Sequence, residues 1–402
     1  MLENYQLKKT EMETKTLLRT LAALFVLAMP LTSMAQKESA LKKKVSKADN
    51  FITKIARSNF DSTYVTLPEH KWMVFVSGNG TYNKYHLRVP MPGIVEDFGL
   101  EDNPVFGNRD IYTYDMDLHS GTQSASIGVG YRTLRLKYSF NIGKVNDQQI
   151  TIESLGSRFG FLVDYRHTKK MKGDMYDPEE GIDAWINNAM TQAAEPMTAG
   201  DVIKAGTHPI NKSYNNFSLL HLQAHYVFNY KHFSYSAGRT ASRIQKKSAG
   251  SPLALIDFYQ SRAKFEKDFI IGTDEVFRTW KLSLGGGYGY NWTPNAGRFL
   301  VQASVMPSIT FFSHSKHKAN LSALTEEEKE GADQVMARVK DMVDGSKITL
   351  NCTARLSATW NINKHYVLGA YGSYQYSNFT NKSRYSIKEN YFSGSLWVGY
   401  RF

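Results

Sequence analysis

The carboxy-terminal third of the chain alternates strictly between apolar and polar residues. From Ile348 to Ile362 the even positions are apolar, Leu356 among them, and the odd positions between them are polar, Arg355 among them. Side chains on a β-strand alternate between its two faces, so the pattern predicts one long strand with an apolar face and a polar face. At 15 residues it exceeds the usual strand length of about 5–6 and suits a tilted strand that crosses a bilayer, which needs about 9–11.

The chain ends in the same pattern. The even positions from Phe392 to Phe402 are apolar or glycine, and the last three residues are Tyr400, Arg401 and Phe402. An aromatic final residue in such a strand resembles the signal that outer-membrane β-barrels present to the barrel assembly machinery. We therefore expect that machinery to be a partner through Phe402.

Alternation of this kind recurs along the whole chain. The phase flips at Arg132-Thr133, which is either a tight turn between two strands or a bulge within one. Counting it as a turn gives twelve candidate strands, at 72–82, 127–131, 134–142, 159–165, 220–230, 233–237, 253–259, 282–292, 299–311, 348–362, 366–376 and 392–402.

These segments predict an all-β fold, a transmembrane antiparallel β-barrel with long extracellular loops. An even strand number keeps both chain ends in the periplasm. Twelve is the direct count, but in that count the four short turns at 132–133, 231–232, 293–298 and 363–365 cannot all lie on the periplasmic side. Treating 122–142 as one bulged strand, and 253–259 as a loop or lumen segment, gives ten strands with every long loop outside, and this is the rival. Thr325 and Glu328 form a capping box that predicts a short helix in one loop.

Composition agrees with a barrel. The mean hydropathy of −0.41 excludes a helical membrane protein, whereas in a barrel half of each strand faces a polar lumen. The 24 Tyr, 22 Phe and 6 Trp residues suit aromatic girdles at the two membrane interfaces. Cys352 is the single cysteine, so no internal disulfide can form.

The amino terminus predicts export. Lys15 and Arg19 precede an apolar run at 21–31 and a small-residue site that ends at Ala35, the three parts of a signal peptide. We expect a cleaved signal peptide at 1–35, a partly helical periplasmic leader at 36–70 and the barrel at 71–402. The predicted address is the outer membrane of a Gram-negative bacterium.

Three short runs carry a family resemblance. They are 60–65 (Phe-Asp-Ser-Thr-Tyr-Val), 226–229 with 233–235, and the run Gln245, Lys246, Lys247, Ser248, Ala249, Gly250 and Ser251. Together they resemble an outer-membrane barrel family of Bacteroides-type bacteria (Bacteroidota), the domain of unknown function number forty-four twenty-one. The resemblance covers about 60–402. It implies an outer-membrane location and supplies no activity, substrate or catalytic residue.

Alternation also predicts which polar side chains face the lumen. The candidates are Arg355, Arg401, Lys281, Arg166, Asp164, His221, Gln223 and His225. Two histidines four residues apart on a strand are separated by about 13 Å, too far to share a metal, so His221 and His225 are interpreted as polar lumen groups. We expect no metal site, no cofactor and no catalytic residue.

Three functions fit these observations. A porin-like channel for small solutes is the first, with a weak anion preference from its arginines. A surface or assembly scaffold with a filled lumen is the second, because narrow barrels are often filled by their own side chains. A lipase-type or protease-type barrel enzyme is the third, although the sequence favours a protein without enzymatic activity. The formal charge of +12 predicts lipopolysaccharide and small anionic solutes as partners besides the lipid bilayer, and no nucleic acid.

Overall fold

We analysed a computed structural model of the protein. It describes residues 46, 50, 60–91, 102–142, 148–191, 195–210, 215–265, 273–325, 329, 348–380 and 385–402. By its internal contacts the chain divides into a unit at 1–54 and a unit at 55–402, and the second unit contains every strand described below.

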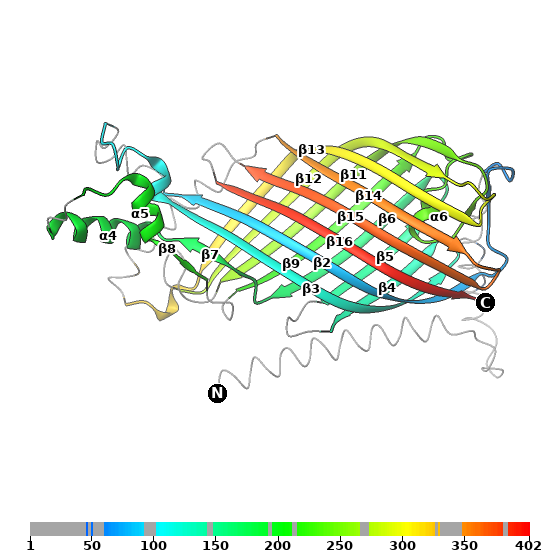
Figure 1. Ribbon diagram of the computed structural model, residues 1–402, viewed down its shortest axis with the longest axis horizontal. Coiled ribbons are helices and arrows are strands. Elements are labelled where there is room, and N and C mark those ends of the chain that lie inside the picture. The colour runs from blue at the N-terminus through cyan, green and yellow to red at the C-terminus, as the bar shows by residue number, and fades with distance from the viewer. Residues whose placement is uncertain are drawn as a thin grey trace. The chain divides into compact units, whose positions relative to one another are not determined.

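Within the described ranges, twelve long strands form one closed antiparallel barrel (Figure 1). Each strand pairs with its two neighbours, and the pairing of the first strand with both the second and the last closes the cylinder. The strands are β2 (Trp72–Pro90), β3 (Thr113–Tyr131), β4 (Leu134–Asn141), β5 (Gln148–Leu155), β6 (Phe159–Lys169), β9 (Asn215–Val227), β11 (Ala249–Phe265), β12 (Glu275–Trp292), β13 (Phe299–Ala319), β14 (Thr349–Asn361), β15 (Tyr366–Thr380) and β16 (Ser386–Arg401).

The predicted number of strands is confirmed, but one predicted segment is wrong and one strand was missed. The segment 233–237 is a short helix, α6 (Tyr235–Arg239), and not a strand. A strand that the prediction did not contain, β5, pairs with β4 and β6 instead. The two errors cancel in the total.

The ten-strand alternative is wrong. The segment 122–142 is two strands joined by a turn at Arg132, whose φ of 53° is a turn conformation, and 253–259 lies inside the paired strand β11. With β5 included, the connections at 132–133, 228–248, 293–298 and 362–365 each follow an even-numbered strand of the barrel. They therefore lie at one end, together with the carboxy terminus.

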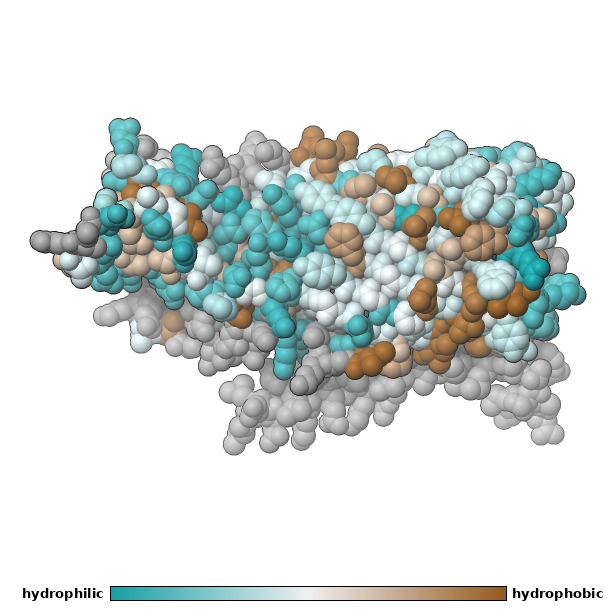
Figure 2. Space-filling view, in the orientation of Figure 1, coloured by the Kyte–Doolittle hydropathy of each residue, from teal (hydrophilic) through white to brown (hydrophobic). Residues whose placement is uncertain are grey.

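The two faces of each strand differ as the alternation predicts. Apolar side chains cover the outside in a band, including Ile127, Phe140, Phe161, Ile256, Leu284, Val305, Leu356 and Leu396, which are all more than 36 % exposed. Figure 2 shows this band on one side of the barrel as brown and white, with hydrophilic teal concentrated toward one end. An apolar outer band is the surface that a bilayer covers.

The outer edge of this band is visible on β2 and β3. Val74 and Val76 are exposed and apolar, and Tyr82 is the last aromatic residue on the outward face of β2. The next outward residue, Lys84, lies 3.4 Å from Asp117 of β3. Charged pairs of this kind belong in water, so the strands continue beyond the bilayer after Tyr82.

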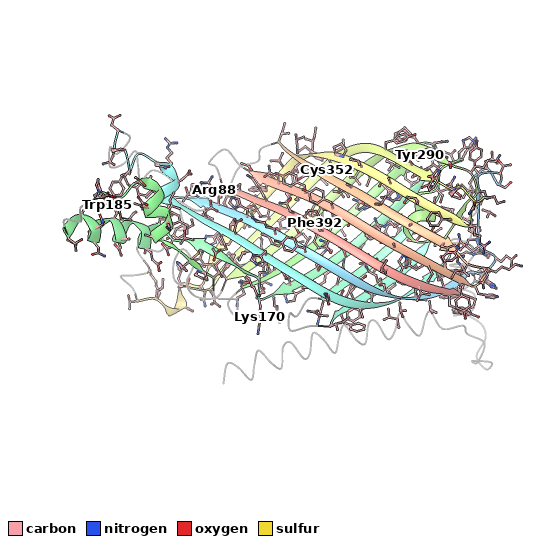
Figure 3. The ribbon with its side chains drawn as sticks, in the orientation of Figure 1. Arg88, Lys170, Trp185, Tyr290, Cys352 and Phe392 are labelled. Carbon is pink, nitrogen blue, oxygen red and sulfur yellow. The ribbon has the colours of Figure 1, made fainter. Side chains whose placement is uncertain are left out.

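A small cap sits on the extended strands at the end opposite the carboxy terminus (Figure 1). It contains β7 (Lys172–Tyr176), α4 (Pro178–Met190), α5 (Ala199–Ala205), β8 (Thr207–Pro209) and the turn helix η2 (Arg109–Tyr112). Its own core includes Trp185, labelled in Figure 3, whose ring meets that of Phe106 edge-on at 4.6 Å. Thr198 and Asp201 form a capping box that begins α5.

Helices play a minor part in the described structure. None of the helices described is both long and apolar enough to cross a bilayer. A 3-10 turn, η4 (Leu321–Ala323), follows β13. The helix predicted to start at Thr325 lies mostly outside the described residues, as do the predicted signal peptide and most of the predicted leader.

Candidate functional site: the lumen

The connection between β9 and β11 folds into the lumen. We call residues 229–248 the plug segment; it contains α6 and the short strand β10 (Ile244–Gln245). Phe233, Tyr235 and Ala237 are at most 2 % exposed. A Cβ atom on Gly238 would lie 2.5 Å from the Cβ of Gln302 on β13, so only glycine fits this close against the wall.

Gln245 organises the plug segment. Its side-chain carbonyl accepts hydrogen bonds from the backbone N–H of Ser234 and from Nδ2 of Asn291, each at 2.9 Å. Its amide nitrogen donates to the carbonyls of His232 at 2.6 Å and Lys247 at 2.8 Å. All four bonds available to a buried glutamine amide are thus used.

The three family-like runs meet at this place. The strand β1 (Val65–Thr66) pairs with β10, and the backbone of Asp61 donates to the carbonyl of Lys231 at 2.9 Å. Lys246 Nζ donates to the carbonyl of Ser62 at 3.1 Å. The Asp61 carboxylate accepts from the N–H of Thr63, which holds the pKa of Asp61 below its usual value. The runs therefore build one structure, a clamp that fixes the plug segment to residues 60–66.

The plug segment is also tied to the barrel wall. Arg355 Nη1 donates to the Tyr235 hydroxyl at 2.7 Å, and its Nη2 donates to Gln223 on β9 at 2.9 Å. Arg239 forms two hydrogen bonds with the Glu153 carboxylate of β5, at 2.9 and 3.1 Å. Arg401 donates to the carbonyl of Ala241 at 2.9 Å. The predicted lumen residues Arg355 and Arg401 thus hold the plug segment in place.

Toward the outer end, aromatic side chains cross the lumen. We call Tyr85, Phe217, Phe265, Phe277 and Phe379 the aromatic barrier; they come from β2, β9, β11, β12 and β15 and pack in one apolar cluster. The rings of Tyr85 and Phe217 stack at 5.0 Å although their strands lie on opposite sides of the barrel. This contact across the cylinder obstructs the lumen at this level.

A chamber of about 90 Å³ lies between the plug segment and the aromatic barrier. One wall, from β15, β16 and β2, carries small polar side chains such as Ser77, Ser373 and Ser395. The facing wall, from β4, β5 and β6, carries long charged ones. The charged lining residues are Arg135, Lys137, Glu153, Asp164, Arg166, Arg239 and Arg355. Five are cationic and two are carboxylates, so the chamber has three positive charges in excess.

Two of the predicted lumen residues form an ion pair in this chamber. Arg166 Nε donates to Asp164 at 2.6 Å, and Arg166 Nη2 reaches Gln375 of β15 at 3.1 Å. Asp164 also accepts from Gln149 at 2.7 Å and from Thr151 at 3.0 Å. The carboxylate of Asp164 is thus satisfied within the protein, whereas Nη1 of Arg166 contacts no acceptor among the described residues.

The other predicted lumen residues lie outside the chamber lining. His221 and Gln223 both contact the Asp257 carboxylate, at 2.9 and 2.8 Å. His225 packs edge-on against Tyr235 at 4.7 Å, and Lys281 donates a hydrogen bond to Ser377.

Two of the histidine–carboxylate pairs in the described structure are enclosed by the barrel. One is His221 with Asp257, and the other is His317 with Glu275 at 2.6 Å. The four side chains are at most 2 % exposed. In the described part of the chain no three His, Cys, Asp or Glu residues cluster as a metal site would require.

Sequence reasoning missed four residues of the chamber, which are Arg135, Lys137, Glu153 and Arg239. Lys137 and Arg135 are the polar positions of the alternating run 134–142, and that signal was available. Glu153 was missed because its strand, β5, was not predicted. Arg239 was missed because the alternation of Phe233 and Tyr235 predicted a strand where the structure has the helix α6.

Several solved structures match the chain at low sequence identity. The outer membrane protease OmpT from Escherichia coli is 9% identical, with a TM-score of 0.39, and the match covers 83% of this chain and 97% of that one. The translocator domain of autotransporter NalP from Neisseria meningitidis is 11% identical at a TM-score of 0.35, covering 90% and 97%. The toluene transporter TodX from P. putida is 10% identical at 0.27, covering 83% and 91%.

Family comparison is more specific. No curated protein matches the chain. A family model, described as Domain of unknown function (DUF4421), matches residues 59–402. This range contains the clamp, the plug segment and all twelve strands of the barrel, and it agrees with the resemblance carried by the three short runs. The chain belongs to the DUF4421 family.

Proposed function

We propose that this protein is an outer-membrane barrel with a closed lumen, which serves as a surface or assembly scaffold and conducts no ions in the state described here. The observation that carries the proposal is the double obstruction of the lumen, by the plug segment at one end and by the aromatic barrier at the other. The cap of α4, α5 and β8 is then the part of the molecule presented to partners outside the cell.

The plug segment is built as a fixed part of the barrel. Gln245 uses all its hydrogen bonds within the protein, and Arg239 pairs with Glu153 through two bonds. Breaking a buried, hydrogen-bonded ion pair costs about 3–5 kcal/mol. Opening the lumen by displacing this segment would break several such contacts at once, which favours the scaffold over a porin-like channel.

Location in the outer membrane is supported by the apolar outer band, by the signal-like segment at 1–35 and by the aromatic end of the chain. The backbones of Phe402 and Trp72 exchange two hydrogen bonds, at 3.0 and 3.1 Å, which join the chain end to the first barrel strand. Lipids and lipopolysaccharide are the expected surroundings, and recognition by the assembly machinery through Phe402 would complete closure.

Conductance in planar bilayers tests the closed lumen. The wild type is expected to give no stable current steps, because ions pass neither the plug segment nor the aromatic barrier. A positive control removes both: residues 229–248 are replaced by a short Gly-Ser linker, and Tyr85 and Phe265 are changed to Ala. If this variant assembles, it should conduct. A variant in which only residues 229–248 are replaced, or one with only the two Ala substitutions, should not conduct. Stable steps from the wild type would overturn the proposal and favour the porin-like channel.

A further inference from the structure

We propose that the chamber between the plug segment and the aromatic barrier binds a small oxyanion, of the phosphate or sulfate class. The inference goes beyond a closed lumen, and it would hold whether or not the barrel conducts. It rests on the charge of the chamber, on the hydrogen-bond donors of its lining residues that lack an acceptor among the described residues, and on its size.

The charge of the chamber is not balanced by the protein. Glu153 is neutralised by Arg239, and Asp164 by Arg166. Arg135, Lys137 and Arg355 are left without a carboxylate partner among the described residues. Arg135 lies over the ring of Phe75 at 3.6 Å, and Arg355 bonds only to neutral groups. Placing several like charges in a space of low dielectric is costly unless an anion joins them.

Hydrogen-bond donors in the chamber are also in excess. Within the described part of the chain, no acceptor contacts Nε of Arg135, Nη1 of Arg166, Nη1 of Arg239 or Nε of Arg355, although these atoms are buried. Lys137 forms no hydrogen bond or ion pair with a described residue. Buried donors are nearly always satisfied. Guanidinium groups that converge with free N–H bonds fit the several acceptor oxygens of an oxyanion.

The size of the chamber selects the ligand. A water molecule needs about 10–15 Å³ of such space, so a cavity of about 90 Å³ holds one small oxyanion with a few waters. A nucleotide or a lipid acyl chain would not fit. Ser373, Ser393 and Ser395 on the opposite wall offer hydroxyl groups as further donors.

Ligand-linked stability measures this binding without requiring rapid entry into the lumen. A ligand that binds only the folded state stabilises it in proportion to the logarithm of its concentration over Kd. The protein is unfolded and refolded in urea and detergent with potassium phosphate, potassium sulfate or potassium chloride at matched ionic strength. Lys137→Gln is the test variant, because it removes an unpartnered cation of the chamber. Lys281→Gln is the matched control, a buried lumen lysine that does not line the chamber.

The wild type should unfold at higher urea in phosphate or sulfate than in chloride. Lys137→Gln should bind phosphate roughly tenfold or more weakly, the usual effect of losing one charge-assisted hydrogen bond, and Lys281→Gln should bind as the wild type does. Equal phosphate stabilisation of wild type and Lys137→Gln would overturn the proposal, as would equal losses in both variants. No stabilisation of the wild type by any oxyanion up to tens of millimolar would also overturn it. Addition of lipopolysaccharide in place of phosphate should not reproduce the effect; if it did, the site would lie on the outer surface.

Discussion

At the scale of single residues, Gln245 of the family-like run 245–251 lies at the centre of a buried hydrogen-bond network. Gln245 is 1 % exposed, and its side chain forms hydrogen bonds with four other residues. Its neighbour Lys247 is exposed and lies 5.2 Å from the ring of Tyr64. The same seven-residue run thus contains one buried position that holds the plug segment and one, Lys247, that faces water.

Replacing Gln245 tests this difference. Gln245→Leu leaves buried donors and acceptors without partners, which costs about 1–3 kcal/mol for the groups concerned. We expect a lower urea midpoint and proteolytic cleavage within residues 229–248. Lys247→Ala should behave as the wild type in both assays, because an exposed substitution rarely matters. Protection of the segment in Gln245→Leu equal to that of the wild type would show that Gln245 does not hold it.

At the scale of elements, alternation predicts a strand well where one face carries apolar residues and the other carries polar residues, as in β14. It fails where that contrast is weak. In β5 only Ile150 and Ile152 alternate with polar residues before Leu155 breaks the phase, so the strand was not predicted. In the plug segment, Phe233 and Tyr235 alternate as in a strand, but both are buried, Phe233 just before α6 and Tyr235 at its first residue.

The orientation of β14 leads to a prediction. Leu356 is 59 % exposed on the outer face, whereas Arg355 is 7 % exposed inside. Leu356→Arg places a charge in lipid, which costs about 2–4 kcal/mol near the bilayer midplane. The folded yield in outer membranes should fall, and that of Leu356→Phe should not. If the two variants assembled equally well, the outer face of this strand would not contact lipid.

The lumen could be predicted only in part from the sequence. The inward positions of Arg355 and Arg166 follow from their phase on single strands. Their partners do not. Tyr235 and Gln223 lie 120 and 132 residues along the chain from Arg355, and Gln375 lies 209 residues from Arg166, so only the closed barrel brings them together.

At the scale of the whole molecule, closure of the barrel joins the two ends of the family-matched region. Trp72 and Phe402 exchange backbone hydrogen bonds, and the ring of Phe402 stacks on Tyr400 at 6.2 Å. The last strand pairs with the first, so the chain end lies at the seam where the barrel closes.

Removing Phe402 tests its role. The truncated protein should reach the outer membrane in lower yield and should lose the heat-modifiable gel mobility of a folded barrel. Phe402→Tyr, which keeps an aromatic end, should assemble nearly as well as the wild type. Normal yield of the truncated protein would assign recognition and closure to other residues.

The closed lumen, the central claim, is tested most directly by the reactivity of a single cysteine in the chamber. In a Cys352→Ser background, Ser373→Cys places a thiol in the chamber, while His119→Cys and Lys247→Cys place thiols at exposed positions at the two ends of the barrel. A bulky, membrane-impermeant thiol reagent should modify both end positions quickly in the folded protein and should modify Ser373→Cys only after unfolding in urea. Rapid modification of Ser373→Cys in the folded state, from either side of the membrane, would contradict the account.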